Sequence, residues 1–306
     1  MSKEHNFVSA VVYLHNCAAD APAFLTMLYG QLEENFEKYE IVCVNDASTD
    51  DSAAVVRSFA KEREFPLTLV QMSTWQGIES AMNAGIDIAI GDFVFEFDTV
   101  QMPYRPELLM ECYRKALQGC DIVCACPKHS RGGIRGAFYR IFNASFDSIY
   151  RVREDAFRVV SRRALNRVHA ISATPPYRKA AYAASGLKVG SLEFTPAFAL
   201  RTVDKDPYGK ALDSLALYTN MFYRISLGVS LAFLLLTLFF AVYTLAVYIS
   251  PVGQVEGWTS TMLVMSIGFF GVFLMLSVVI KYLSLLVELN FKKQRYLVEG
   301  IEKIQK

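Results

Sequence analysis

Residues 39–52 read YEIVCVNDASTDDS and combine an apolar run with a polar ending. The run 39–45 carries apolar residues at both alternating positions, which is typical of a β-strand buried on both faces. The Asp, Ser and Thr residues that follow it are the types that cap a helix N-terminus. We therefore predict a buried strand, a polar loop around Asp46 and a helix over residues 50–64.

The same alternation of strands and helices extends through the first two hundred residues. We expect further strands over residues 7–14, 67–72, 93–97 and 121–126, and helices over residues 21–36, 77–90 and 106–118. This order predicts an α/β fold with helices on both faces of the sheet. Ligands of such sheets bind at the carboxyl ends of the strands, so we expect the functional residues in those loops.

An acidic pair follows this rule at the end of the strand over residues 93–97. Glu96 and Asp98 stand at i and i+2, so their side chains point the same way on an extended chain. Carboxylate oxygens in this arrangement can hold a hard divalent cation. Such a cation would neutralise a diphosphate leaving group. A solvated loop that happens to carry two acids is the alternative interpretation.

Two uncharged segments, residues 225–250 and 258–280, lie near the C-terminus. Each is longer than the roughly 20 apolar residues that cross a bilayer as a helix. Lys and Arg flank the outer ends of this hairpin, whereas the loop over residues 251–257 has neither. The positive-inside rule therefore predicts an integral membrane protein with both termini in the cytoplasm. Because the N-terminal residues contain no apolar segment before the first strand, we expect no signal peptide.

The overall charge is nearly balanced, with 31 Lys and Arg against 30 Asp and Glu. This net charge of +1 gives no excess of cations for a phosphate backbone, so we expect no nucleic-acid partner. A hydrophobic content of 53% excludes a disordered polyelectrolyte. The length of 306 residues permits one large domain or two ordinary ones.

Three motifs precede the hairpin, and they read VNDASTDDS at residues 44–52, GIESAMNAGIDIAIG at 77–91 and DFVFEFD at 92–98. Their order resembles the family 2 glycosyltransferases of GT-A fold, which have a Rossmann-like mixed sheet flanked by helices. With the hairpin, the chain looks most similar to the polyprenyl-phosphate glycosyltransferases, the dolichol-phosphate-mannose synthase-like group. This resemblance implies inverting, metal-assisted transfer from a UDP- or GDP-sugar to polyprenyl (undecaprenyl) phosphate, which supplies a lipid-linked sugar to the cell envelope.

The resemblance also implies roles for particular residues. Nucleotide contacts are implied for Tyr13, His15, Asn16, Asp46, Ser48 and Gly77, with Asp46 on the base. Ligands of Mg²⁺ or Mn²⁺ are implied at Glu96, Asp98 and Gln101, which makes Asp98 a catalytic residue through the metal. Glu96 replaces an Asp of the family motif, and Cys17 replaces a Glu that contacts ribose in relatives. The nucleotide is therefore left unassigned.

Cations beyond residue 126 are expected to bind the phosphate groups of acceptor or donor, because guanidinium and ammonium groups bind phosphate oxygens. They are Lys128, Arg131, Arg140, Arg158, Arg201 and Lys205. Contact with anionic headgroups at the membrane surface is the alternative interpretation for these residues. Asp155 is the candidate catalytic base, and an ion pair with an arginine is the alternative role for its carboxylate.

These inferences divide the chain into four parts. We predict a cytoplasmic catalytic domain over residues 1–210, a juxtamembrane amphipathic helix over 211–224, the membrane hairpin over 225–280 and a cytoplasmic surface helix over 281–306. Relatives with such a hairpin imply a possible homotetramer. A catalytically inactive membrane scaffold of GT-A fold is the alternative to an enzyme, because several family motifs are altered.

Overall fold

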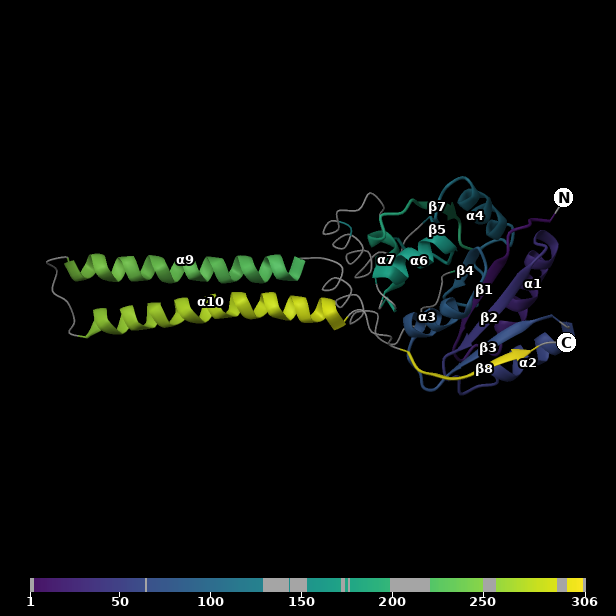
Figure 1. Ribbon diagram of the computed structural model, residues 1–306, viewed down its shortest axis with the longest axis horizontal. Helices are drawn as coiled ribbons and strands as arrows, with labels where there is room; N and C mark the ends of the chain where they lie inside the picture. Colours follow the sequence, from purple (N-terminus) through teal and green to yellow (C-terminus); the bar gives the residue numbers. More distant parts are fainter. Residues whose placement is uncertain are drawn as a thin grey trace. The chain divides into compact units, whose positions relative to one another are not determined.

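The computed structural model describes residues 3–63, 65–128, 143, 153–171, 174–175, 177–198, 221–249, 257–290 and 296–304. The chain divides into two compact units. Residues 1–214 and 292–306 form the first unit, which contains the sheet, and residues 215–291 form the second, which contains two long helices (Figure 1).

A mixed sheet forms the centre of the first unit. Among the described residues its strands are β1 (Val8–Leu14), β2 (Tyr39–Asn45), β3 (Leu67–Met72), β4 (Phe93–Phe97), β5 (Ile122–Pro127), β6 (Phe157–Ser161), β7 (Val189–Phe194) and β8 (Val298–Ile304). Their order across the sheet is β7-β5-β6-β4-β1-β2-β3-β8. Strands β1 to β4 run parallel, whereas β6 runs antiparallel between β4 and β5. The carboxyl ends of β1–β4 and the start of β6 therefore share one edge.

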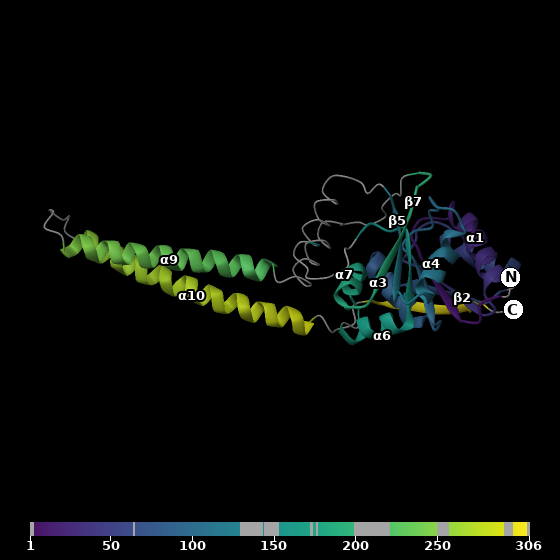
Figure 2. The same ribbon diagram turned by 90° about the horizontal axis from the view of Figure 1, so that it is seen from above.

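Helices cover both faces of this sheet (Figure 2). The helices α1 (Ala21–Asn35), α2 (Ser52–Arg63) and α4 (Leu108–Leu117) enclose the main apolar core on one face. The helices α3 (Ile78–Ile88) and α7 (Arg178–Ala184) lie on the other face, and α6 (Arg162–Ile171) packs beside β6. The strands and helices predicted within residues 7–126 are confirmed close to their predicted bounds, because each shows a clear apolar period between turn and cap signals.

The predicted surface helix over residues 281–306 is wrong in its second half. The helix α10 (Trp258–Asn290) ends at Asn290, and residues 298–304 form β8, which pairs antiparallel with β3 (Figure 1). Alternate residues of β8 are shielded and exposed, a period of two that is typical of a strand and not of a helix. Glu302 of β8 also pairs with Arg57 of α2 at 2.8 Å. The chain thus returns to the first unit after the hairpin.

Both uncharged segments are helical, as predicted. The helices α9 (Met221–Ile249) and α10 contain two stretches long and apolar enough to cross a membrane, Leu227–Val247 and Ser260–Ile280. Large apolar side chains project outward along them, for example Phe239 and Met275, which are 64% and 71% exposed. Lipid is the natural solvent for such a surface. Most of the predicted helix over 211–224 and of the loop over 251–257 lies outside the described residues.

Gly91 lies in tight contact with the central strand β1. A Cβ atom at this position would lie 2.5 Å from the backbone nitrogen of Ser9 and 2.8 Å from the carbonyl carbon of Val8. Because backbone atoms of a central strand cannot move aside locally, we expect Gly91→Ala to lower the free energy of unfolding by about 1–3 kcal/mol. Urea denaturation of the purified protein measures this loss.

Gly30 provides the matched control for this substitution. It lies in α1, and a Cβ atom there would meet nothing within 4 Å. Alanine also has the higher helix propensity, so Gly30→Ala should leave stability unchanged or raise it slightly. Equal losses in the two variants would contradict the steric argument.

Candidate functional site

The loops at the shared edge of β1–β4 bring together two groups of side chains. An aromatic group surrounds Asp46, which follows β2, and a charged cluster surrounds Asp98, which follows β4. Strand β1 pairs in parallel with β2 on one side and β4 on the other, so these two loops flank the loop that follows β1 at the same edge of the sheet. Most of the candidate residues from the sequence fall in or beside these two groups.

Asp46 is fully buried and organises the turn that leads from β3 to α3. Its carboxylate accepts hydrogen bonds from the backbone N–H groups of Gln76 and Gly77 at 2.8 and 2.7 Å, and from the hydroxyl of Tyr13 at 3.0 Å. Gly77 has φ 85°, in the left-handed region that favours glycine. Asp46 therefore has a structural role here, and its contact with a base stays a prediction.

His15 and Trp75 form an aromatic pair beside Asp46. Their rings stack with centroids 4.5 Å apart and planes inclined by 12°. The imidazole Nδ1 lies 2.7 Å from the carbonyl oxygen of Asp46, which fixes the ring as a donor at this atom. Trp75 is 39% exposed, so part of its indole faces solvent at the strand edge. This surface is suited to stacking of a planar ring.

Asn16 and Ser48, two further predicted nucleotide contacts, join the loops after β1 and β2. The side-chain oxygen of Asn16 accepts a hydrogen bond from the backbone N–H of Thr49 at 2.8 Å. The hydroxyl of Ser48 accepts one from the backbone N–H of Asn16 at 3.1 Å. These hydrogen bonds hold the two loops together at the edge of the sheet. Direct contact of Asn16 and Ser48 with a nucleotide stays a prediction.

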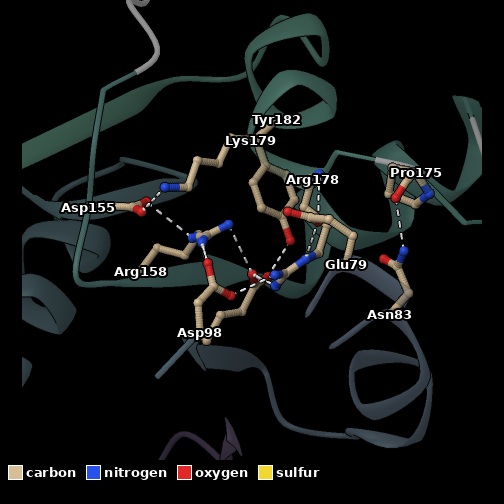
Figure 3. Close-up of polar contacts among 10 residues, drawn as sticks. Glu79, Asn83, Asp98, Asp155, Arg158, Pro175, Arg178, Lys179 and Tyr182 are labelled. Atoms are coloured by element: carbon tan, nitrogen blue, oxygen red, sulfur yellow. Dashed lines mark hydrogen bonds and ion pairs between the residues drawn. The ribbon is translucent and has the colours of Figure 1, made fainter. Parts of the chain in front are cut away.

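The charged cluster begins with Glu96 on β4, which lies opposite Arg158 on β6 in the antiparallel pair. Arg178, the first residue of α7, places one terminal nitrogen 2.6 Å from Oε2 of Glu96 and the other 2.6 Å from Oδ1 of Asp98. Arg158 pairs with the second oxygen of Asp98 (Figure 3). The hydroxyl of Tyr182 donates to Oε1 of Glu96. Two strands and one helix thus converge on one set of ion pairs.

Three more charged side chains extend the cluster (Figure 3). Glu79, in the first turn of α3, accepts hydrogen bonds from the backbone N–H and the Nε of Arg178 at 3.0 and 2.9 Å. Asp155 lies 2.5 Å from the Nζ of Lys179 and 3.2 Å from the Nε of Arg158. The carboxylate of Asp155 is only 2% exposed, so the ion-pair role left open by the sequence is the one that the structure shows.

Burial and pairing act in opposite directions on the two acids at the end of β4. Burial raises the pKa of Glu96, against the attraction of Arg178 and Arg158. Burial also opposes ionisation of Asp98, but Arg158 and Arg178 outweigh it and hold the pKa of Asp98 well below its ordinary value. The side chain of Asp98 is 23% exposed and Glu96 is 0% exposed. Asp98 is therefore the acid of this pair that reaches solvent.

The predicted metal ligands do not fit a divalent cation as they are arranged. Each oxygen of Glu96 and of Asp98 is engaged by an arginine nitrogen or by the Tyr182 hydroxyl. Gln101 lies in the following loop, where its backbone N–H donates to the hydroxyl of Thr99 at 3.2 Å. Within the described part of the chain, no group of three or more His, Cys, Asp or Glu side chains could hold a metal ion.

The predicted phosphate-binding cations are described only in part. Arg158 lies in the cluster, and Lys128 follows β5 at the same edge with an exposed side chain. Its backbone N–H donates to the carbonyl of Phe194 at 2.9 Å, which ties it to β7. The other four, Arg131, Arg140, Arg201 and Lys205, lie outside the described residues.

Sequence reasoning missed five residues of this edge, which are Trp75, Glu79, Arg178, Lys179 and Tyr182. One signal was present, because an acid in the middle of a buried strand, Glu96, requires a buried cation. Arg178 and Tyr182 stand at i and i+4 in an alanine-rich segment, so a helix places them on one face. Only the fold shows that this face meets Glu96.

Residues 9–182, more than half of the chain, match the glycosyl transferase family 2. The protein therefore belongs to this family, and the family and fold class predicted from the sequence are confirmed. A glucosyl-3-phosphoglycerate synthase from Mycobacterium tuberculosis, solved with Mn²⁺, UDP and phosphoglyceric acid, superposes with a TM-score of 0.51 at 13% identity over 69% of this chain and 76% of that one. At this identity the likeness concerns the fold alone.

Two relatives illustrate the sequence similarity. An undecaprenyl-phosphate 4-deoxy-4-formamido-L-arabinose transferase of Aeromonas hydrophila is 31% identical over 38% of this chain and 35% of its own length. The uncharacterized glycosyltransferase YkcC of Bacillus subtilis is 23% identical over 89% of this chain and 87% of its own length. The chain thus matches about a third of the Aeromonas transferase and most of the Bacillus protein.

Proposed function

We propose that this protein is a membrane-bound glycosyltransferase that transfers a sugar from a UDP- or GDP-sugar to polyprenyl (undecaprenyl) phosphate. The observation that carries this proposal is the presence in one chain of a family 2 domain and two helices apolar enough to cross a membrane. A lipid acceptor keeps its phosphate at the bilayer surface, so the enzyme must be held there too. The acceptor named in the Aeromonas relative supports this choice.

The proposed reaction is a single displacement. A phosphate oxygen of the lipid attacks the anomeric carbon, the bond from that carbon to the diphosphate oxygen breaks, and the nucleoside diphosphate leaves with inversion. The attacking phosphate is already an anion and needs no general base. This agrees with Asp155 being paired with Lys179 and Arg158.

The positions of the side chains at this edge of the sheet support one orientation of the nucleotide-sugar. The base lies against Trp75 and His15, and the diphosphate points toward Asp98 and the cations around it. The Mycobacterium synthase contains Mn²⁺ with UDP. A corresponding Mg²⁺ or Mn²⁺ requirement here would need Glu96 and Asp98 to be released from Arg158 and Arg178.

The path of the chain supports the proposed topology. Strand β8 follows α10 and belongs to the same sheet as β1, so the segments before and after the hairpin lie on one side of the membrane. The Lys and Arg residues outside the hairpin favour the cytoplasm as that side. In that location the protein would supply a lipid-linked sugar for cell-envelope glycans. A homotetramer stays a prediction, which sedimentation of the detergent-solubilised protein tests.

The decisive experiment offers labelled UDP- and GDP-sugars with undecaprenyl phosphate to the detergent-purified protein, in Mg²⁺, Mn²⁺ or EDTA. Label in the lipid fraction is the expected result and identifies the sugar. An inactive scaffold is the second candidate, favoured by the complete pairing of Glu96 and Asp98. That candidate predicts no transfer from any donor and no binding of UDP or GDP.

Trp75→Ala should weaken nucleotide binding under the proposed function. Loss of stacking with a base costs about 1–3 kcal/mol, so we expect the Kd for UDP or GDP to rise roughly 5- to 150-fold. Calorimetric titration measures the change. Trp75→Phe keeps an aromatic face and should retain most of the affinity, and Trp258→Ala, at the start of α10, should not alter it. An unchanged Kd in Trp75→Ala would remove the indole from the nucleotide site.

A further inference from the structure

The charged cluster holds an internal cation between the two acids that were expected to bind a metal ion. The guanidinium of Arg178 bridges Glu96 and Asp98, with 2.6 Å from one terminal nitrogen to each carboxylate. We propose that Arg178 takes the place of a divalent cation in this protein, and that a nucleoside diphosphate binds at this edge without a metal ion. The second statement rests on the proposed function, whereas the first does not.

Arg178 is fixed from a third side and is not a mobile surface residue. Its side chain is 0% exposed, and both its backbone N–H and its Nε donate to Glu79. The backbone hydrogen bond anchors the first residue of α7, so the guanidinium is positioned by the start of a helix. A metal ion could reach the two acids only after the terminal nitrogens of Arg178 had left Glu96 and Asp98.

The remaining oxygens of the acid pair are occupied as well. Arg158 pairs with the second oxygen of Asp98 and lies 3.4 Å from Glu96, and Tyr182 donates to the other oxygen of Glu96. Arg158 is 1% exposed. A divalent ion on the acid pair would therefore leave the buried Arg178 with Glu79 alone and the buried Arg158 with Asp155 alone. Losing the other ion pairs is unfavourable in a medium of low dielectric constant.

The charge of the cluster is already close to balance. Four carboxylates, Glu79, Glu96, Asp98 and Asp155, face three cations, Arg158, Arg178 and Lys179, so their charges sum to −1. A divalent ion would change this sum to +1 and would lie beside two guanidinium groups. Positive charge for a diphosphate is instead available from Lys128, whose side chain is exposed after the end of β5.

Direct measurement of Mn²⁺ binding tests the first statement without any activity assay. The full chain in detergent is titrated with Mn²⁺, and the free ion is followed by electron paramagnetic resonance. We expect the wild type to bind no stoichiometric Mn²⁺ at a free concentration of about 0.1 mM, which is the order of the dissociation constants of weak oxygen-ligand cation sites. We expect Arg178→Ala to bind one equivalent, because removing the guanidinium frees Oδ1 of Asp98, leaves Oε2 of Glu96 with only its 3.4 Å contact to Arg158, and opens the space between the two acids.

Controls separate this result from misfolding and from non-specific binding. Arg178→Gln keeps much of the side-chain volume and provides a second test if Arg178→Ala does not fold, which circular dichroism reveals. Arg163→Ala removes an exposed arginine that pairs with Asp121, and it should gain no Mn²⁺ site. One equivalent of Mn²⁺ on the wild type that disappears in Asp98→Asn would overturn the proposal. So would a folded Arg178 variant that binds no Mn²⁺.

Titration with UDP and GDP tests the second statement. We expect the wild-type Kd for the nucleotide that binds to change less than twofold between EDTA and Mn²⁺. A Kd at least tenfold lower with Mn²⁺ would overturn metal-free binding. Failure of both nucleotides to bind under either condition would contradict the proposed function, while the Mn²⁺ titration would still determine which cation the acid pair holds.

Discussion

Arg178→Met should lower the free energy of unfolding by about 3–5 kcal/mol, the usual effect of removing one partner from a buried ion pair. Methionine approximates the volume of the arginine stem but removes the cation from Glu79 and from Oδ1 of Asp98, and it leaves Glu96 with only the 3.4 Å contact to Arg158. Glu96 is 0% exposed and cannot recover the loss by contact with water. Urea denaturation of the intact protein in detergent, followed by tryptophan fluorescence, measures the change.

Arg163→Met is the matched control for this prediction. Arg163 also pairs with one acid through two nitrogens, at 2.8 and 2.6 Å from Asp121, but its side chain is 72% exposed. Water can replace the guanidinium at such a surface pair, so its loss should have a much smaller effect. Similar destabilisation in both variants would show that the buried cluster is not the source of the effect.

Asp98→Asn should reduce sugar transfer about 100-fold or more under the proposed function, the loss typical of removing one preorganised charged contact from an active site. Asp98 contacts both Arg158 and Arg178 and is the acid of the pair that reaches solvent. Removing the charge of Asp98 takes one ion pair away from each of the two guanidinium groups. The measurement is kcat and KM for transfer to undecaprenyl phosphate, with the identified donor.

Two variants show whether this effect is specific. Asp98→Glu keeps the charge and should recover part of kcat. Asp92→Asn changes an acid just before the start of β4, where Asp92 accepts the backbone N–H of Phe7 at 3.0 Å, and its kcat should stay within twofold of the wild type. Unchanged turnover in Asp98→Asn would remove Asp98 from the active site.

The stability difference between Asp98→Asn and the wild type should also depend on pH in a defined way. Because Arg158 and Arg178 lower the pKa of Asp98 against the effect of burial, its stabilising contribution is complete above its unfolded-state pKa of about 3.9. The contribution is lost only as pH falls through the lower folded-state pKa. The difference should therefore be constant from pH 6 to 8 and should shrink in acid, which denaturation at several pH values measures.

Local patterns were sufficient for the elements that have a strong period and clear boundaries. The strands Tyr39–Asn45 and Phe93–Phe97 begin and end at the predicted residues, because turn and cap signals lie on both sides of each apolar run. The segment that forms β8 has no turn or cap signals on both sides. Its mixture of apolar and charged residues fits a surface helix as well as an edge strand. Pairing with β3, more than two hundred residues away in sequence, selects the strand.

The residue types and their order predicted an α/β domain, an apolar helical hairpin and a sheet edge that carries Asp46, Glu96 and Asp98. These features depend on short-range periodicity and on the rule that parallel strands end at the same edge. Which cation meets Glu96 and Asp98 is a different kind of question. Arg178 lies about eighty residues further along the chain, and only the placement of α7 beside the end of β4 puts its guanidinium between the two carboxylates. A buried charge must be neutralised by whichever group the fold brings within contact distance, and that distance is a property of the tertiary structure.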